Sequence, residues 1–295
     1  MSSIVCLDLE HLELPGAIAA YVVLDPEPTV VDPGPSTALT ALLGGLARLG
    51  LGPHDLRHVA LTHVHLDHAG ATGHLVDVFP DAVVHIHADG APHMVDPTRL
   101  VASTRRTFGE AHDRLWGEVR PVPAHRIRPW RAGEVGPWPG LSVVPTPGHI
   151  AHHLGYLHEA EGTLFAGDSL GLVLGSHAPT QPTTPPPAVD LRAWERTLDA
   201  IAAVAPQRVG PTHFGLYGSV PDRVDQMRRT LADLEARVRG AMARGEADED
   251  ALRYDREVRD EMARYVGKAE VERYFNLFAA ATDYAGVRFY LERNR

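Results

Sequence analysis

The chain of 295 residues has little cysteine, little lysine and no long apolar run. Its single cysteine, Cys6, excludes an internal disulfide framework and any metal site built from several thiolates. The longest apolar run, 17–24, has eight residues, whereas a membrane-spanning helix needs roughly 18. The first residues include Asp8, Glu10 and Glu13 and have no basic segment, so no secretory signal is visible. We therefore expect a cytoplasmic globular protein that does not bind a membrane.

The chain is acidic, and its excess of acidic residues lies in one part. It holds 38 acids and 28 bases, a formal net charge of −10. Residues 1–215 carry 22 of the acids and 13 of the bases, so the remaining residues are nearly balanced. Because a negative surface repels phosphate backbones, we expect no nucleic-acid partner. All 18 histidines lie at or before His213, which directs the search for a metal site to the same part.

Strand-like and helical patterns alternate over the first two thirds of the chain. Strands are predicted over 18–24, 29–32, 58–61, 83–87, 141–145, 154–158, 163–166 and 207–210. Helices are predicted over 37–49, 69–79, 105–116 and 191–204, and Asp190 is placed to cap the last of these. This order predicts an α/β (α+β) architecture in which helices cover sheets. Residues 92–131 lack a strand rhythm and 171–189 are rich in glycine and proline, so each is either a wall of a site or a plain connection.

From residue 219 onward the pattern is helical throughout. Pro221 suits the first turn of a long helix that ends near Gly245. One face of this helix carries an apolar stripe, formed by Val224, Met227, Leu231, Leu234, Val238 and Ala241. Two more helices are predicted over 248–266 and 269–284. We therefore divide the chain into a catalytic domain, 1–218, and a helical extension, 219–295, which either docks on that domain or forms a homodimer interface.

Four metal-ligand side chains crowd the turn between the predicted strand 58–61 and the helix that follows it. His63 and His65 stand two apart on extended backbone and point to the same side, so they can hold one cation. Asp67 and His68 begin the next turn and can reach a second position nearby. Three imidazoles and a carboxylate within six residues are costly to hold together without a metal, which strongly favours a metal site over a structural cluster.

Three further candidates follow other predicted strands. His149 comes after Val-Pro-Thr-Pro-Gly, Asp168 after Leu-Phe-Ala-Gly, and His213 after Arg-Val-Gly-Pro-Thr. Each would be weak evidence alone, because Gly-His and Gly-Asp pairs are common turns. Loops beyond strand ends converge on one edge of a sheet sandwich, where a site would be assembled. Together with the HxHxDH stretch, the three make a strong set.

The order strand-Asp at Asp32, then THxHxDH, PTPGH, GD and THFG resembles the metallo-β-lactamase-fold hydrolases over about 18–214. The resemblance implies a four-layer αββα sandwich with a two-metal site at one edge. It implies that His63, His65 and His149 bind one metal, that Asp67, His68 and His213 bind the other, and that Asp168 bridges them. By the same resemblance, Asp32 is a buried acid that orients a ligand histidine. Separately from the resemblance, His153 follows His149 within one turn and is a candidate for supporting the ligands from behind.

The donor set also predicts the chemistry. Five imidazoles and two carboxylates without a thiolate suit two Zn²⁺ ions best and are compatible with Fe²⁺ or Mn²⁺. Two cations about 3.5 Å apart lower the pKa of a shared water toward neutrality, and the bridging hydroxide then attacks a carbonyl or phosphoryl centre. Asp67 is the expected catalytic proton acceptor. The sequence therefore predicts a dinuclear hydrolase that acts on a small molecule.

The sequence determines the fold better than the branch of the superfamily, because one fold can carry many functions. True β-lactamases of this fold lack the bridging acid, and flavodiiron reductases replace the second histidine of the motif by Glu and append a flavodoxin domain. Glyoxalase II-like thioesterases share the ligands, but Lys268, the single lysine, offers no basic glutathione site. Lactonases carry Tyr where this chain has Gly171. An ester, lactone or thioester is the expected substrate; a mononuclear iron persulfide-dioxygenase-like enzyme and a non-catalytic metal-binding or sensor module are the alternatives.

Other polar residues near the motifs are candidates for substrate contact. His177, on the glycine-rich loop after Asp168, is the first of them, although loop histidines are more often bystanders. His152 follows His149 within one turn, and a solvent-exposed residue without a role in the site is an equally good interpretation of it. Arg105 and Arg106 could meet an anionic substrate, with a solvated helix face as the simpler interpretation.

Overall fold

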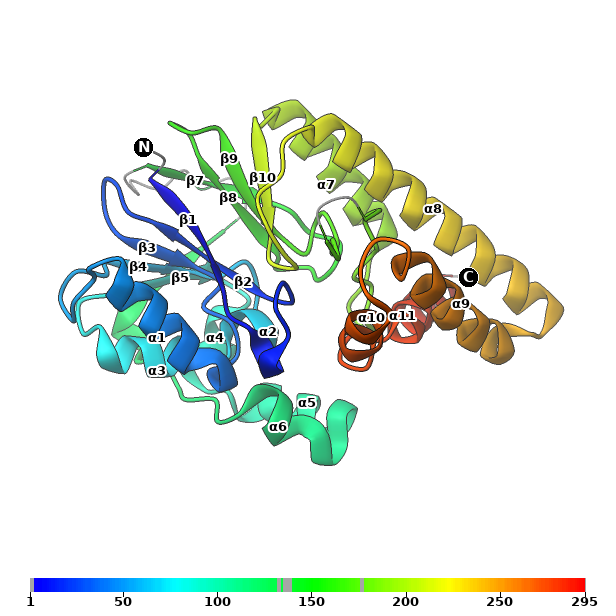
Figure 1. The fold of residues 1–295 in the computed structure, drawn as a ribbon, viewed down its shortest axis with the longest axis horizontal. Coiled ribbons are helices and arrows are strands. Elements are labelled where there is room, and N and C mark those ends of the chain that lie inside the picture. The colour runs from blue at the N-terminus through cyan, green and yellow to red at the C-terminus, as the bar shows by residue number, and fades with distance from the viewer. Residues whose placement is uncertain (1–2, 132–133, 135–139, 176–177, 295) are drawn as a thin grey trace.

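Two β-sheets pack face to face in the computed structural model, which describes residues 3–131, 134, 140–175 and 178–294 (Figure 1). Strands of the first sheet follow chain order: β1 (Ile4–Asp8), β2 (Ala19–Val23), β3 (Thr29–Val31), β4 (His58–Ala60), β5 (Val83–His87) and β6 (Ile127–Trp130). The second sheet has the order β10 (Arg208–Pro211), β9 (Thr163–Gly167), β8 (Leu154–His158) and β7 (Leu141–Pro145). Strands β3 to β6 are parallel, so their carboxyl ends share one edge.

Helices form the two outer layers. The first sheet is covered by α1 (Leu39–Arg48) and α3 (Thr72–Val78), and the second by α7 (Leu191–Val204) and α8 (Val220–Arg244) (Figure 1). The short α2 (Leu66–Ala69) precedes α3, and α4 (Ala91–Val95), α5 (Thr98–Phe108) and α6 (His112–Trp116) lie between β5 and β6 in the chain. The 3₁₀ turns are η1 (His11–Glu13), η2 (Ser36–Ala38), η3 (Gly109–Ala111) and η4 (Ala124–Arg126). The predicted four-layer αββα sandwich is thus confirmed.

Alternation along β2 shows how the sequence builds these layers. Ala19, Tyr21 and Val23 face the second sheet and join an inter-sheet core with Tyr156 and Phe165. The residues between them in β2 belong to the larger cluster on the helix side. Because successive side chains of a strand point to opposite faces, a strand that is apolar throughout can serve both layers. This accounts for the uninterrupted apolar run at 17–24.

Several predicted elements are wrong in their bounds or were missed. Strand β1 pairs antiparallel with β2 at the sheet edge, and β6 extends the sheet in the stretch that shows no strand rhythm. The predicted helix 105–116 is α5 and α6 with a 3₁₀ turn between them. The predicted helix 69–79 is α2 and α3. Short edge strands carry little periodicity, and their pairing is decided by the neighbouring strand rather than by their own sequence.

The C-terminal helices are α8, α9 (Ala247–Met262), α10 (Lys268–Phe275) and α11 (Ala280–Arg293). The predicted helix 269–284 is therefore two helices. The whole predicted stripe of α8 is buried, and α8 ends at Gly245 in the left-handed conformation. Asp190 caps α7 by accepting a hydrogen bond from Ala193 N at 3.0 Å, as predicted.

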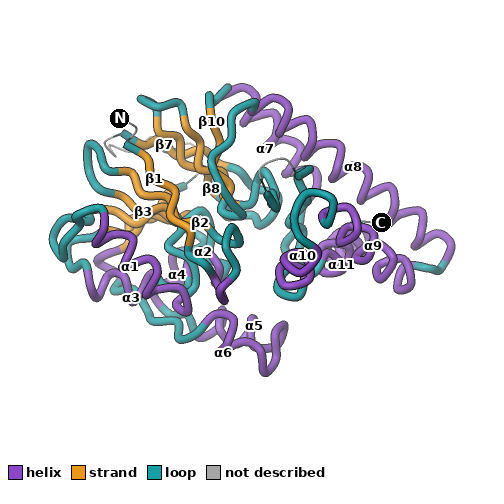
Figure 2. Tube along the Cα trace, in the orientation of Figure 1, coloured by secondary structure: helices purple, strands orange, loops and turns teal. Residues whose placement is uncertain are grey.

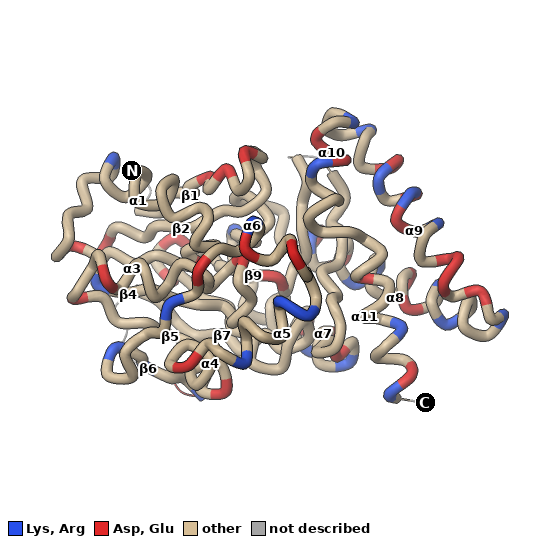
Figure 3. The backbone as a smooth tube through the Cα atoms, turned by 90° about the horizontal axis from the view of Figure 1, so that it is seen from below, with Lys and Arg blue, Asp and Glu red and all other residues tan. Residues whose placement is uncertain are grey.

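The apolar stripe of α8 packs inside the chain. Its residues share one cluster with Trp194 and Leu198 of α7 and with Tyr284 of α11. The stripe is therefore covered within the chain. Acidic and basic residues alternate along the outer side of α9 (Figure 3). Among the helices of the described residues, none combines the length and the apolar character needed to cross a bilayer.

Candidate metal centre

Loops at one edge of the sandwich carry the candidate ligands. Asp32 follows β3, the HxHxDH stretch follows β4, and His149, Asp168 and His213 follow β7, β9 and β10. Figure 2 shows loops between the two sheets and the C-terminal helices, and Asp67 and His68 lie in the short helix α2 that follows the loop after β4. The strand ends thus bring together all seven residues predicted as ligands, although they are spread over 151 positions of the chain.

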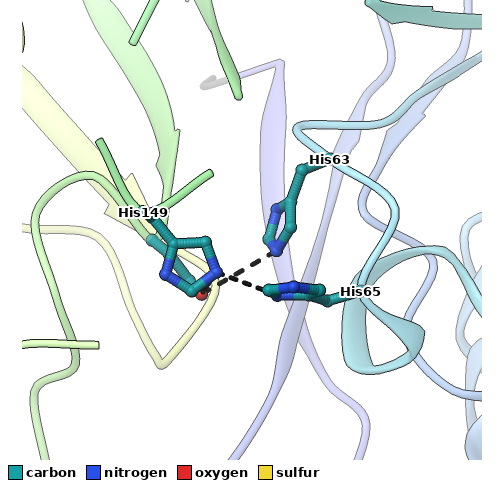
Figure 4. A group of neighbouring side chains, drawn as sticks. His63, His65 and His149 are labelled. Atoms are coloured by element: carbon teal, nitrogen blue, oxygen red, sulfur yellow. Dashed lines mark hydrogen bonds and ion pairs between the residues drawn. The ribbon is translucent and has the colours of Figure 1, made fainter. Parts of the chain in front are cut away.

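The first group of donors consists of His63, His65, His149 and Asp168, whose nearest ligand atoms all lie within 4.8 Å of one another. His149 Nε2 is 2.9 Å from His65 Nδ1 and 3.2 Å from Asp168 Oδ2. His63 Nε2 is 4.0 Å from the same carboxylate oxygen. Figure 4 shows His149 facing His63 and His65 from the opposite side of the site.

The second group consists of Asp67, His68 and His213. Asp67 Oδ2 is 3.4 Å from His213 Nε2 and 3.7 Å from His68 Nε2. The other oxygen of Asp168, Oδ1, faces this group at 3.4 Å from His68 Nε2 and 3.6 Å from His213 Nε2. Each oxygen of the Asp168 carboxylate therefore faces a different donor group.

These residues fit divalent cations. His63 Nε2, His68 Nε2 and Asp168 Oδ1 are buried and have no hydrogen-bond partner among the described residues, which is costly for polar atoms unless something else binds them. Donors 2.0–2.1 Å from a tetrahedral cation lie about 3.3 Å apart, and most of the separations above are close to that value. The geometry accommodates one cation in each group.

Asp32 supports the second group by accepting several hydrogen bonds. It is fully buried, and its Oδ2 accepts hydrogen bonds from His68 Nδ1, Thr62 Oγ1 and Thr212 Oγ1 at 2.7–2.8 Å. Its Oδ1 accepts the backbone N–H of Thr62. With Nδ1 of His68 donating to Asp32, Nε2 carries the lone pair that faces the site. Asp32 has φ 49°, a left-handed conformation that Asp tolerates better than most residues.

Two further predicted ligand histidines are held by backbone carbonyls. His213 Nδ1 donates to Ala17 O at 3.1 Å, and His149 Nδ1 donates to Thr183 O at 2.6 Å. His153 lies behind the ligands as predicted: its Nε2 accepts the backbone N–H of Asp168 at 3.1 Å. These bonds fix which ring nitrogen is free to bind a cation.

Sequence reasoning did not identify Thr62, Thr212 or Thr183 as parts of the site. Thr62 and Thr212 each directly precede a predicted ligand, in Thr-His pairs that recur after two strands. That repetition was the available signal. Thr183 had no comparable signal, because it lies 34 positions from the histidine it supports.

Charges at the centre shift the pKa values of its members in opposite directions. Burial opposes charge on His68, yet the carboxylates of Asp168, Asp67 and Asp32 raise its pKa well above the usual value. Burial and the neighbouring imidazoles lower the pKa of His63 well below the usual value. The pKa of Asp168 is lowered despite burial, because His68 and His149 stabilise the carboxylate. The pKa of Asp67 is lowered in the same way. Asp168 and Asp67 are therefore both ionised donors at neutral pH.

The centre is partly open to solvent. His65 and Asp67 are partly exposed, whereas the other five donors are buried. Phe278, from the segment between α10 and α11, packs against His213 with ring centroids 4.9 Å apart. Tyr274 of α10 has its hydroxyl oxygen 3.5 Å from His213 Nδ1. The helical extension thus reaches the second donor group, which the sequence did not indicate.

Other predicted substrate contacts have different outcomes. His177 lies outside the described residues. At Gly171, which has φ +67°, a Cβ would lie 2.1 Å from Gln181 O, so the backbone of the following loop occupies the place of a side chain. His152 is 8% exposed and its Nε2 has no hydrogen-bond partner among the described residues, so it is not the solvent-exposed residue that one interpretation assumed. Arg105 pairs with Asp113 on an exposed helix face.

Comparison with known proteins agrees with this architecture. The sequence model of the metallo-beta-lactamase superfamily matches residues 14–213. YqjP of Bacillus subtilis (strain 168), described as a probable metallo-hydrolase, is 26% identical over 246 residues, which are 74% of this chain and 75% of that protein.

Solved structures show the same fold. The metallo-beta-lactamase family protein TTHA1429 from Thermus thermophilus superposes with a TM-score of 0.67 at 24% identity, over 99% of this chain and 92% of that one. The superfamily protein ST1585 from Sulfolobus tokodaii gives 0.64 at 22% identity, over 79% and 86%. TTHA1623, solved in a di-iron-bound form, gives 0.52 at 26% identity, over 72% and 93%. Since the superfamily's sequence model covers more than half of the chain and the fold agrees, this protein belongs to the metallo-beta-lactamase superfamily.

Proposed function

We propose that this protein is a dinuclear metal-dependent hydrolase that cleaves an ester, a lactone or a thioester of a small molecule. The observation that carries the proposal is the carboxylate of Asp168, which presents one oxygen to each of two complete donor groups. A bridging acid between two cations is suited to hydrolysis, in which both ions act on one reacting centre. The similarity to YqjP, described as a metallo-hydrolase, supports the same reaction class.

His63, His65 and His149 would hold one cation, Asp67, His68 and His213 the other, and Asp168 both. Nitrogen and oxygen donors without thiolate favour Zn²⁺ and are compatible with Fe²⁺ or Mn²⁺. The di-iron form of TTHA1623 gives support to iron. When bound, such ions lower the pKa of a shared water toward neutrality and polarise the bond to be broken.

The chain's own residues supply the rest of the mechanism. Asp67 is ionised and partly exposed, so its carboxylate can accept a proton from a water that enters from the solvent and return it to the leaving group. Asp32 keeps the His68 ring oriented through the hydrogen bond at Nδ1, so that Nε2 is the ring nitrogen directed at the site. The buried ligands behind them exclude bulk water from the reacting atoms.

Purified protein loaded with zinc, iron or manganese should hydrolyse at least one class in a panel of p-nitrophenyl esters, acyl-thioesters and lactones. His63→Ala, which removes a ligand, is the control and should reduce that rate to background. Absence of turnover above the control on every substrate, including bis-p-nitrophenyl phosphate, would favour a binding or sensor module. Oxygen uptake with a persulfide by an iron-loaded, hydrolytically silent protein would instead favour the dioxygenase alternative.

A further inference from the structure

The segment Pro-Thr-Thr-Pro-Pro-Pro at 182–187 runs directly behind the first donor group. Thr183 accepts the hydrogen bond of His149 Nδ1 at 2.6 Å, and its hydroxyl donates to the backbone carbonyl of Asp168 at 3.1 Å. Thr183 and Thr184 are both buried. Through these two bonds the segment contacts a predicted ligand of the first cation and the acid that faces both groups.

Because of its prolines, this segment has few backbone N–H groups that can donate hydrogen bonds. Proline has no backbone N–H, so within 182–187 only Thr183 and Thr184 can donate one. The N–H of Thr184 donates to Asp283 Oδ1 of α11 at 2.6 Å. The hydroxyl of Thr184 donates to the backbone carbonyl of Asp283 at 3.0 Å. A helix of the C-terminal extension therefore anchors the segment at two points.

The backbone of α11 also lies against the segment without intervening side chains. A Cβ placed on Gly286 would be 1.7 Å from the carbonyl oxygen of Thr184, so only glycine allows this approach. Gly286 stands one helical turn after Asp283 and thus on the same face of α11. Hydrogen bonds and close packing independently fix the segment against the helix.

We propose that Asp283 is a positioning residue for the metal centre: it fixes the 183–184 backbone, whose Thr183 carbonyl orients His149. The C-terminal extension is then part of the first donor group's support rather than a separate appendage. This inference rests on the proposed function, because it takes His149 as a metal ligand. It concerns the first donor group, since His68 and His213 of the second donate to Asp32 and Ala17 of the sandwich and the extension meets that group at His213 through Tyr274 and Phe278.

The test is a metal titration of the full-length chain that compares Asp283→Ala with Asp283→Asn. The protein competes with a chromophoric chelator for Zn²⁺ or Co²⁺. Asp283→Ala should weaken one of the two binding steps by about tenfold, as loss of an outer partner of a ligand does, and change the visible spectrum of Co²⁺ at that site. Burial raises the pKa of the Asp283 carboxyl well above its usual value, so neutral Asn, which keeps the oxygen acceptor, should restore both steps.

A matched control separates positioning from general stability. Asp250→Ala breaks the ion pair with Arg237 in the same extension, and among the described residues neither partner hydrogen-bonds to His149 or to the 182–187 segment. It should lower the thermal midpoint and leave both metal-binding steps unchanged. If Asp283→Ala does not fold, Thr184→Val tests the same anchor by removing one donor, with an expected weakening of about threefold.

The outcomes distinguish the two proposals. A wild-type chain that binds no transition metal would overturn the proposed function and this inference with it. Two metals in the wild type, with both steps unchanged in Asp283→Ala or Thr184→Val, would overturn the inference alone. Equal weakening by Asp283→Asn and Asp283→Ala would do the same, because Asn retains the acceptor.

Discussion

The two donor groups of the metal centre are supported by different parts of the molecule. The second group rests on Asp32 and Ala17, which belong to the sandwich. The first rests on Thr183, whose segment is fixed by α11 of the extension. The hydrogen bonds that orient the second group therefore come from the sandwich, with Tyr274 and Phe278 of the extension packed against His213. In the first group, the orientation of His149 depends on a helix that follows the sandwich in the chain. Changes in the extension should act on one cation more than on the other.

Deletion of residues 219–295 is the most drastic way to test this dependence. It removes α8 to α11 and uncovers the side of α7 that packs against α8. We expect an aggregating or unfolded product, detected by loss of solubility and by strong binding of a hydrophobic dye. A truncated protein of unchanged thermal midpoint that still holds two metals would show that the sandwich supports both groups alone.

Asp168→Ala should affect both groups at once, because it removes the one acid that faces each of them. Metal content should fall toward one ion per chain, and hydrolysis should drop by roughly 100-fold or more, since losing even an outer partner of a ligand costs 10- to 100-fold. Elemental analysis and the rate on the best substrate of the panel measure the two effects. Retention of two ions and of a near-normal rate would show that Asp168 does not bridge.

Asp32→Ala should weaken the second group selectively, in contrast to Asp283→Ala. The change leaves the donors of His68, Thr62 and Thr212 without their buried acceptor, and breaking a buried charged network of this kind costs about 3–5 kcal/mol. Urea unfolding of the metal-free chain measures that loss, and metal titration shows which step is weakened. If the step affected were the one that responds to Asp283→Ala, the division between the two groups would be wrong.

A smaller effect is expected at His85 of the first sheet, which belongs to neither donor group. His85 lies between Trp130 Nε1 at 3.1 Å and His58 Nδ1 at 2.9 Å, and burial, with a contribution from His58, lowers its pKa to about 3. In the unfolded chain this imidazole gains a proton below pH about 6.5, whereas in the folded chain it does so only near pH 3. Stability should therefore fall as the pH drops through that window, by up to about 1.4 kcal/mol per pH unit.

His85→Gln should make this acid dependence shallower. Urea unfolding of the metal-free protein between about pH 7 and pH 4.5, inside that window, measures the slope, and the chelated form avoids any contribution from metal release. If the slope of the unfolding free energy against pH is unchanged, titratable groups other than His85 govern the loss of stability in acid.

Local patterns were enough to locate most of the elements and all of the predicted ligands. Asp190 and the stripe of α8 follow from capping and from the 3.6-residue period, which operate over a few neighbouring residues. The ligands follow from short motifs placed after strands. Strand β6 and the break between α10 and α11 escaped detection, because pairing with β5 and packing of the extension decide them rather than their own sequences.

By itself, then, the sequence determined the layers of the sandwich and the edge where imidazoles and carboxylates gather, because periodicity and strand ends are encoded locally. Only the tertiary structure decided what holds each ligand. Asp32 meets Thr212 from 180 positions away, and Asp283 meets Thr184 from 99 positions away. Such pairs join side chains with backbone that no spacing rule connects, and they exist only once helices and sheets have packed.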